Sequence, residues 1–112
     1  MKLSLPLPPS INATYKTGRG VFYKSDKAKV WENTAGHILL PLRPKNPLEG
    51  QLCVNITMFL KRDRDIDGSL KLLFDLLQKM GFFINDSQIY DLRVKKLKDK
   101  DNPHIEVEIK LL

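Results

Sequence analysis

Three aspartates stand at alternate positions in the segment of residues 61–67, which reads KRDRDID and contains Asp63, Asp65 and Asp67. Acids in such a segment have two interpretations. Asp65 or Asp67 could cap a following helix by accepting hydrogen bonds from its first backbone N–H groups. Capping uses one acid, however, and clustered carboxylates repel one another unless cations or a hard divalent metal neutralise them. The segment is therefore a candidate metal site as well as a candidate helix cap.

A further acid, Asp86, comes after the predicted helix, whereas the three aspartates of residues 61–67 come at or before its start. The helix that separates Asp86 from these aspartates is expected to span about 14 residues and thus about 21 Å. Asp86 can join the cluster only if the chain returns along the sheet edge. The alternative is that the residues Asn85-Asp86-Ser87 form an ordinary turn. The sequence leaves both interpretations open.

Lys71 lies four residues after Asp67 and four before Asp75, so all three share one face of a helix. One interpretation is a surface salt bridge between residues i and i+4, which stabilises a helix by only a few tenths of a kcal/mol. The other is a cation beside a metal site, where Lys71 would hold a phosphate or stabilise charge that develops in a transition state.

The composition favours a globular protein with an anionic partner. The chain has 112 residues, 42% of them hydrophobic and 29% charged, which excludes disordered, collagen-like and coiled-coil classes. Its net charge of +6 and pI of about 9.5 favour a polyanion such as nucleic acid. The single cysteine, Cys53, excludes an internal disulfide and a cysteine-rich zinc site. We find neither a secretory leader nor an apolar run of membrane-spanning length, so we expect a cytoplasmic protein without a membrane partner.

Most of the excess positive charge lies in the first half of the chain, around a stretch with two glycines at residues 18 and 20. These cations could bind DNA phosphates or could belong to a solvated loop. A second basic run at residues 93–98 has the same two interpretations. The candidate DNA-binding residues are Lys16, Arg19, Lys24, Lys27, Arg62 and Arg64.

The elements that position these residues follow from hydrophobic periodicity. We expect strands at residues 2–7, 21–24, 51–60, 89–98 and 105–111, the last two joined as a hairpin around residues 99–103. Helices are predicted at 25–40, with Ser25 as its N-cap and Pro41 closing it, and at 67–80, with Gly81 as its C-terminal cap. Leu111 is expected to face the core. The result is one α+β domain over residues 1–112, a small mixed sheet packed with two helices.

The second helix has an apolar arc wider than half a turn. One small sheet need not cover such an arc, so part of it could pack on the first helix or on a second subunit. We therefore expect a dimer interface formed by this arc or by the N-terminal proline segment, residues 6–9. His37 and His104 lack the spacing of a metal-ligand pair and are expected to be structural.

Three separated motifs resemble one family. They are LPLPPSINATY at residues 5–15, DIDGSLK at 65–71 and GFFINDSQI at 81–89. In order and spacing they resemble the RusA family of Holliday junction resolvases, small endodeoxyribonucleases typical of phages and prophages. The resemblance covers nearly the whole chain. Gly68 stands where the family usually has Asn, Asn85 replaces the first acid of an Asp-Asp pair, and Leu7 stands where a tryptophan is often found.

This resemblance implies a RusA-like fold and a homodimer that binds four-way junction DNA. It implies paired nicks in symmetric strands, with Mg²⁺ as cofactor or Mn²⁺ in its place, in DNA recombination and repair. The family's metal-binding catalytic acids correspond to Asp65, Asp67 and Asp86, and its important lysine corresponds to Lys71. Such chemistry suits the residues, because Mg²⁺ held by carboxylates orients a phosphate and activates water.

Two other functions stay open at this stage. The first is a non-catalytic DNA-binding module of the same fold, an alternative that depends on Gly68 and Asn85. The second is a structural or interaction subunit that uses the wide apolar helix. The second predicts no metal binding and little salt-dependent affinity for DNA.

Overall fold

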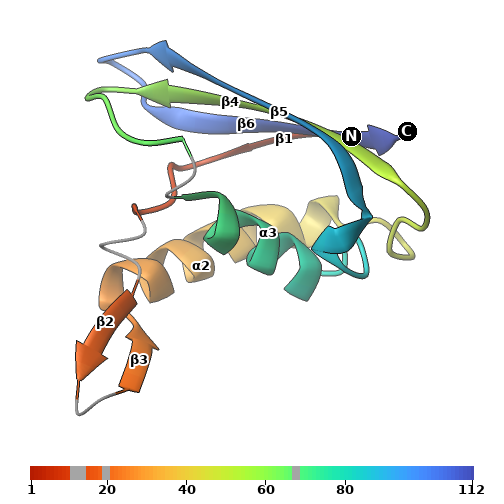
Figure 1. Cartoon of the computed structure of the whole chain (residues 1–112), viewed down its shortest axis with the longest axis horizontal. Coiled ribbons are helices and arrows are strands. Elements are labelled where there is room, and N and C mark those ends of the chain that lie inside the picture. Colours follow the sequence, from red (N-terminus) through yellow and green to blue (C-terminus); the bar gives the residue numbers. More distant parts are fainter. Residues whose placement is uncertain (11–14, 19–20, 67–68) are drawn as a thin grey trace.

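The computed structural model describes residues 1–10, 15–18, 21–66 and 69–112, with side chains from 1–10, 25–66 and 69–112. It consists of a four-stranded sheet with two helices against one face and a separate two-stranded hairpin (Figure 1). The sheet contains β1 (Lys2–Leu5), β4 (Leu52–Leu60), β5 (Ile89–Lys98) and β6 (His104–Leu111), in the order β1-β6-β4-β5. The α+β prediction is thereby confirmed. The remaining elements are β2 (Tyr15–Gly18), β3 (Val21–Lys24), α2 (Asp26–Leu39), α3 (Leu70–Lys79) and single 3-10 turns at Leu40–Leu42 and Asp86–Gln88.

β4 forms the centre of the sheet because one of its faces is wholly apolar. Its even positions are buried under the helices, as the alternation predicts; they are Leu52, Val54, Ile56, Met58 and Leu60. β6 contributes Ile105, Val107 and Ile109 to the same core. Its Leu111, expected to face the core, is instead 62% exposed, because it is the last residue of β6, at the end of the sheet. β1 also ends at Leu5, earlier than predicted, because Pro6 has no N–H to donate.

The predicted hairpin between the last two strands is wrong. β4 lies between them, antiparallel to β6 and parallel to β5. The reason is the connection through α3, which returns the chain to the start of β4 so that β5 runs in the same direction as β4. The segment 99–103 then crosses over the end of β4, where the Asp99 N–H donates to the Leu60 carbonyl at 2.8 Å.

α2 begins and ends as its sequence predicts. The Ser25 hydroxyl accepts a hydrogen bond from the Ala28 N–H at 3.2 Å, and the helix gives way to a 3-10 turn that contains Pro41. Its buried residues, spaced for one helical face, are Ala28, Trp31, Ala35 and Leu39. Trp31 Nε1 donates to the Pro6 carbonyl at 2.8 Å, which fixes the proline segment against this helix.

α3 is covered within a single chain. Its buried residues are Leu72, Leu73, Phe74, Leu76 and Leu77, and Leu70 and Met80 pack partly against the same core. The helix therefore needs no second subunit for its apolar arc. The proline segment is engaged as well, since the Ser69 hydroxyl lies 3.4 Å from the Pro8 carbonyl and 3.3 Å from that of Pro9. α3 ends at Lys79 with Met80 as its C-cap, and the following Gly81 has a φ of +84°, which suits glycine.

β2 and β3 pair antiparallel and extend away from the main sheet (Figure 1). The strand at Val21–Lys24 was predicted, whereas the strand at Tyr15–Gly18 was not. Within the described ranges, no helix has both the length and the apolar character needed to cross a bilayer.

Candidate functional site

The segment that leaves β4 is anchored by β5. Lys96 Nζ donates to Asp63 Oδ1 at 2.7 Å and to the Arg64 carbonyl at 3.0 Å. The hydrogen bond and the positive charge of Lys96 together hold the pKa of Asp63 below its ordinary value. Asp63 is thus engaged in an ion pair with Lys96, and this ion pair holds the segment that follows β4 against β5.

Asp65 is exposed and follows directly after this anchor. Asp67 and Gly68 lie outside the described residues. Of the two predicted ligands in this segment, the structure describes Asp65 alone, and Asp65 precedes the N-terminal end of α3.

Arg64 lies between the anchored acid and the exposed one, and its charge is incompletely matched. Its Nε and Nη2 atoms are buried and, in the part of the chain that the structure describes, have no hydrogen-bond partner. Burial lowers the pKa of its guanidinium. Unsatisfied buried donors cost stability. Because a guanidinium binds phosphate through paired hydrogen bonds, this side chain is suited to a phosphate ligand.

Lys71 lies in the first turn of α3, at the same end as Asp65. Its Nζ is 3.6 Å from Asp75 Oδ2; the lysine side chain is 65% exposed and the aspartate side chain 38%. The i,i+4 salt bridge of the structural interpretation is therefore present. Such an exposed pair stabilises the fold little, and the lysine could exchange this partner for a phosphate at small cost.

Asp86 lies in an ordered turn, as the turn interpretation predicts. The Asn85 side chain accepts a hydrogen bond from the Ser87 N–H at 2.9 Å, and Gln88 Oε1 accepts from the N–H groups of Ile84 and Asn85. The Gln88 amide in turn donates to the carbonyls of Leu48 and Gly50, at the approach to β4. The exposed Asp86 thus lies on a turn in which hydrogen bonds hold both the preceding residue, Asn85, and the following residue, Ser87.

Asp86 lies at the C-terminal end of α3. Its N–H donates to Gln78 Oε1 at 3.1 Å, and Gln78 belongs to the last turn of the helix. The ten-residue helix is about 15 Å long. The sheet separates the same two ends, because Leu52 pairs with Ile89 at one end of β4 and Leu60 with Lys98 at the other, about 26 Å away.

Within one chain, therefore, the structure does not bring Asp86 back to Asp65. Among the described residues there is also no group of three potential metal ligands from His, Cys, Asp and Glu. Of the predicted site residues, Asp65 and Lys71 share one end of α3 and Asp86 occupies the other.

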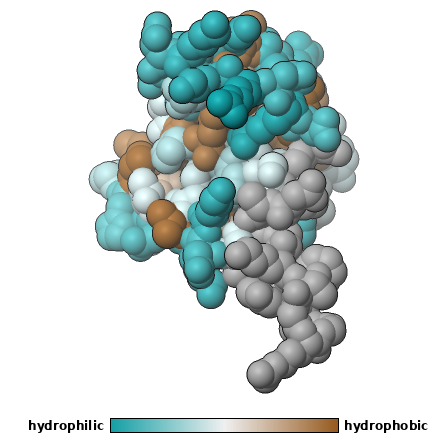
Figure 2. Space-filling model, turned by 90° about the vertical axis from the view of Figure 1, so that its left-hand side faces the viewer, coloured by the Kyte–Doolittle hydropathy of each residue, from teal (hydrophilic) through white to brown (hydrophobic). Residues whose placement is uncertain are grey.

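Cations gather at the Asp65 end. A hollow there is lined mainly by basic residues and includes Lys61, Arg62, Asp63, Lys96 and Lys98. Figure 2 looks onto this end, and hydrophilic residues cover the upper part of the view. Two of the four cations in the second basic run, Lys96 and Lys98, line this hollow. In β5 they are on the side of the sheet that carries the helices, while Arg93 and Lys95 are on the open side.

The other candidate DNA-binding residues are only partly described. Lys27 is exposed near the start of α2. Lys16 and Lys24 lie on the strands of the projecting hairpin, and their side chains, like all of Arg19, are outside the described residues. Sequence reasoning missed Lys96 as an individual residue, and no local signal could have found it, because its contact with Asp63 depends on the parallel pairing of β5.

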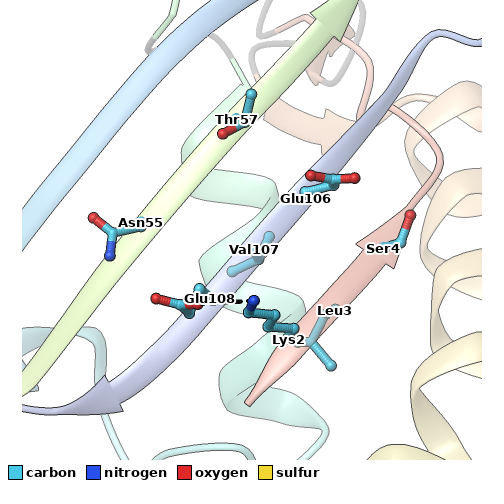
Figure 3. Close-up of a pocket in the computed structure, with 8 residues that line it drawn as sticks. All are labelled: Lys2, Leu3, Ser4, Asn55, Thr57, Glu106, Val107 and Glu108. Atoms are coloured by element: carbon cyan, nitrogen blue, oxygen red, sulfur yellow. Dashed lines mark ion pairs between the residues drawn. The ribbon is translucent and has the colours of Figure 1, made fainter.

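A separate hollow lies on the open face of the sheet (Figure 3). It is lined by Lys2 and Glu108, which form an ion pair of 3.7 Å, and by residues that include Asn55, Thr57 and Glu106. It contains none of the predicted catalytic acids and lies on the side of the sheet away from Asp65 and Asp86.

The family model described as endodeoxyribonuclease RusA matches residues 6–110. The crossover junction endodeoxyribonuclease RusA of Escherichia coli K12 is 29% identical over 109 residues, covering 96% of this chain and 91% of the relative. The protein of that name in Enterobacteria phage 82 is also 29% identical over 109 residues, with the same coverage of 96% and 91%. That of Aquifex aeolicus is 30% identical over 108 residues, covering 95% of this chain and 85% of the relative.

Proposed function

The chain belongs to the RusA endodeoxyribonuclease family, and on this basis we propose that it resolves four-way DNA junctions as a homodimer, by paired Mg²⁺-dependent nicks. The observation that carries the proposal is the family match over residues 6–110, a range that contains every proposed catalytic residue. These are the metal ligands Asp65, Asp67 and Asp86, with Lys71 as a catalytic cation.

The positions of the acids dictate how the metal site must be built. Asp65 and Asp86 lie at opposite ends of α3 and of the sheet, so the carboxylates of one chain cannot share an ion in this fold. They can share one if Asp86 of one chain meets Asp65 and Asp67 of a second copy. A two-fold axis then produces two identical composite sites. One site for each of two symmetric strands is what paired nicking requires.

The donor set fits the proposed ion. Carboxylate oxygens are the hard ligands that Mg²⁺ and Mn²⁺ prefer, and no softer ligand is needed. A bound Mg²⁺ would polarise the scissile phosphate and lower the pKa of an attacking water. Asp65, Asp67 and Asp86 would hold it, and the repulsion among them would be relieved in the process.

The cations of the Asp65 end complete the chemistry. Arg64 would bind a phosphate and orient the backbone for in-line attack. Lys71 would leave Asp75 and stabilise negative charge as it develops on the phosphate. The basic hollow around Lys96 and Lys98 would bind neighbouring phosphates, which predicts affinity that falls steeply with salt.

The departure at Asn85 does not weaken this proposal. Its side-chain oxygen accepts the Ser87 N–H bond that orders the turn, and an aspartate would make the same bond. The first position of the family's acid pair thus has a structural role that Asn fulfils. The metal-binding role rests with Asp86.

Cleavage of a synthetic four-way junction, with each strand labelled in turn, tests the proposed function. We expect nicks in two symmetric strands with Mg²⁺ and none in EDTA, and no nicks in a linear duplex of the same sequence. Salt-sensitive junction binding without cleavage in Mg²⁺ or Mn²⁺ would instead identify a non-catalytic DNA-binding module. Neither binding nor cleavage would favour a structural subunit.

A further inference from the structure

The segment of residues 62–66, which contains Asp65, is attached to β5 by one lysine. The Lys96 ammonium group bonds two points of the segment, the Asp63 carboxylate at 2.7 Å and the Arg64 carbonyl at 3.0 Å. Among the described residues, no other residue from outside the segment forms a hydrogen bond with it. Lys96 therefore supplies the hydrogen-bonded attachment of this segment to the sheet.

The bond to the Arg64 carbonyl reaches the backbone of Asp65. The carbonyl oxygen of Arg64 and the N and Cα atoms of Asp65 belong to one planar peptide group. A hydrogen bond that fixes this oxygen therefore restricts the plane that ends at the Asp65 Cα atom. Asp65 itself is exposed, so packing does little to orient it. Its direction depends on the peptide group that Lys96 holds.

The position of Lys96 suits a fixed support. It pairs with Met58, two residues before β4 ends, so its backbone is part of the parallel ladder. Its side chain is 32% exposed, whereas the lysines that form ion pairs with Glu108 and Asp75 are 58–84% exposed. A side chain that is already partly enclosed loses less conformational entropy when it binds the segment.

The charge of Lys96 is balanced at the point where it acts. Asp63 neutralises it at 2.7 Å, and two of the three donors of the ammonium group are in use. An unpaired ammonium group would repel a cation bound by Asp65, whereas a neutral ion pair does not. The ion pair can therefore stand beside a metal site and support one of its ligands.

We propose that Lys96 is a positioning residue for junction cleavage. It holds the peptide group between Arg64 and Asp65, so that the Asp65 carboxylate is already directed when a metal binds. This inference rests on the metal site of the proposed function. Mg²⁺ demands nearly octahedral geometry at about 2.0–2.1 Å, so a ligand on a loose segment binds it less well. Residues that orient metal ligands typically contribute about 10–100-fold to metal affinity or activity.

Limited trypsin digestion tests the attachment without reference to catalysis, because trypsin can cut after Arg62 and Arg64. Lys96→Met keeps an unbranched stem and removes the donors. Below the Tm, we expect trypsin to cut this segment at least about fivefold faster in Lys96→Met than in wild type, since proteolysis follows the open population. Lys96→Arg keeps charge and donors and should recover part of the protection. Lys110→Met, which breaks an ion pair with Glu108, is the matched control and should leave the rate unchanged.

Junction cleavage then separates positioning from direct phosphate binding. The double variant Asp63→Asn/Lys96→Met removes the ion pair without changing the net charge. We expect it to raise the Mg²⁺ concentration for half-maximal nicking by at least about tenfold. Its Kd for the junction without metal should stay within about threefold of wild type, because the balance of charge that governs phosphate affinity is kept.

Three results would overturn the proposal. The first is a segment as resistant to trypsin in folded Lys96→Met as in wild type. The second is faster trypsin cutting with an unchanged Mg²⁺ requirement for nicking. The third is nicking that falls only in proportion to junction binding, which would make Lys96 a phosphate contact.

Failure of the proposed function would look different. A wild-type protein that never nicks a junction in Mg²⁺ or Mn²⁺ contradicts that function, and the catalytic part of this proposal falls with it. The trypsin comparison still decides whether Lys96 holds the segment. Normal wild-type nicking together with any of the three results above contradicts the role of Lys96 and leaves the function standing.

Discussion

The two ends of α3 hold their acids in different ways. At the C-terminal end, Asp86 lies on a turn whose hydrogen bonds come from Asn85, Gln78 and Gln88. At the N-terminal end, one acid is neutralised by Lys96, the next is exposed, and Arg64 between them has buried donors without partners among the described residues. In the proposed function, the first end supplies a metal ligand and the second binds substrate phosphates. The proposed metal site needs acids from both ends, and therefore from two copies of the chain.

Removing an acid from either end should have the largest effect. Asp65→Asn, Asp67→Asn and Asp86→Asn should each reduce junction cleavage at least roughly a thousandfold, because a metal contributes several kcal/mol to such a transition state. Junction binding, measured by gel shift, should stay intact or become tighter. Asp63→Asn is the control for these three variants, since the Asp63 carboxylate is engaged by Lys96 and is not a proposed metal ligand. Full nicking by all three variants would remove the proposed metal site.

At the N-terminal end of α3, Lys71 tests whether a cation there acts in cleavage or only in the salt bridge with Asp75. Lys71→Ala should slow cleavage by about ten- to a hundredfold, as expected for a lost transition-state cation. Its unfolding free energy should fall by less than about 0.5 kcal/mol, because the salt bridge with Asp75 is exposed. Asp75→Asn breaks the same salt bridge but keeps the lysine, so its cleavage rate should match wild type. Equal losses of activity in both variants would assign Lys71 a structural role.

Gln88 tests whether the C-terminal end is a prepared ligand. Its side chain accepts two backbone hydrogen bonds and donates two, so Gln88→Ala should lower the unfolding free energy by about 1–3 kcal/mol. Urea unfolding measures this loss. Cleavage should recover when Mg²⁺ is raised, because Asp86 itself remains. Gln88→Glu keeps both acceptor bonds and should recover part of the stability; a variant no better than Gln88→Ala would place the effect in the donated bonds alone.

The smallest effect concerns His104, at the end of the open sheet face. A hydrogen bond with the Asn102 carbonyl, assisted by Glu106, raises the pKa of His104 above its ordinary value of 6.5. A raised pKa contributes stability below about pH 6.5 that is lost as pH rises through the folded value. The Tm advantage of wild type over His104→Gln should therefore shrink between pH 6 and pH 8. Because Glu106 is 55% exposed, this stabilisation should stay below about 1 kcal/mol. An advantage that grew with pH would contradict the assignment.

Local sequence patterns predicted the individual helices and strands better than they predicted which strands pair with each other. The alternation of β4 and the Ser25 cap of α2 are properties of a few consecutive residues, and both predictions are confirmed. The order of strands is not local: the β5–β6 hairpin was wrong because nothing in either strand reveals that β4 inserts between them. The contact of Lys96 with Asp63 follows from that pairing and was missed for the same reason.

The acid site shows the same limit at a larger scale. Residue types and the family resemblance identify Asp65, Asp67, Lys71 and Asp86, and these assignments stay predictions. The sequence left open whether Asp86 returns to Asp65. The structure places them at opposite ends of α3. A single sequence carries no direct signal for contacts between two copies, so only the fold could indicate a shared site.

The most direct test of a shared site mixes two inactive variants. In a heterodimer of Asp65→Asn with Asp86→Asn, one composite site has lost both acids, and the other retains every ligand. We therefore expect co-expressed or co-refolded variants to regain junction nicking in one strand per dimer, while each variant alone stays inactive. If each site lay within one chain, both sites of the heterodimer would be damaged. A verified heterodimer that remained as inactive as its parents would contradict this account.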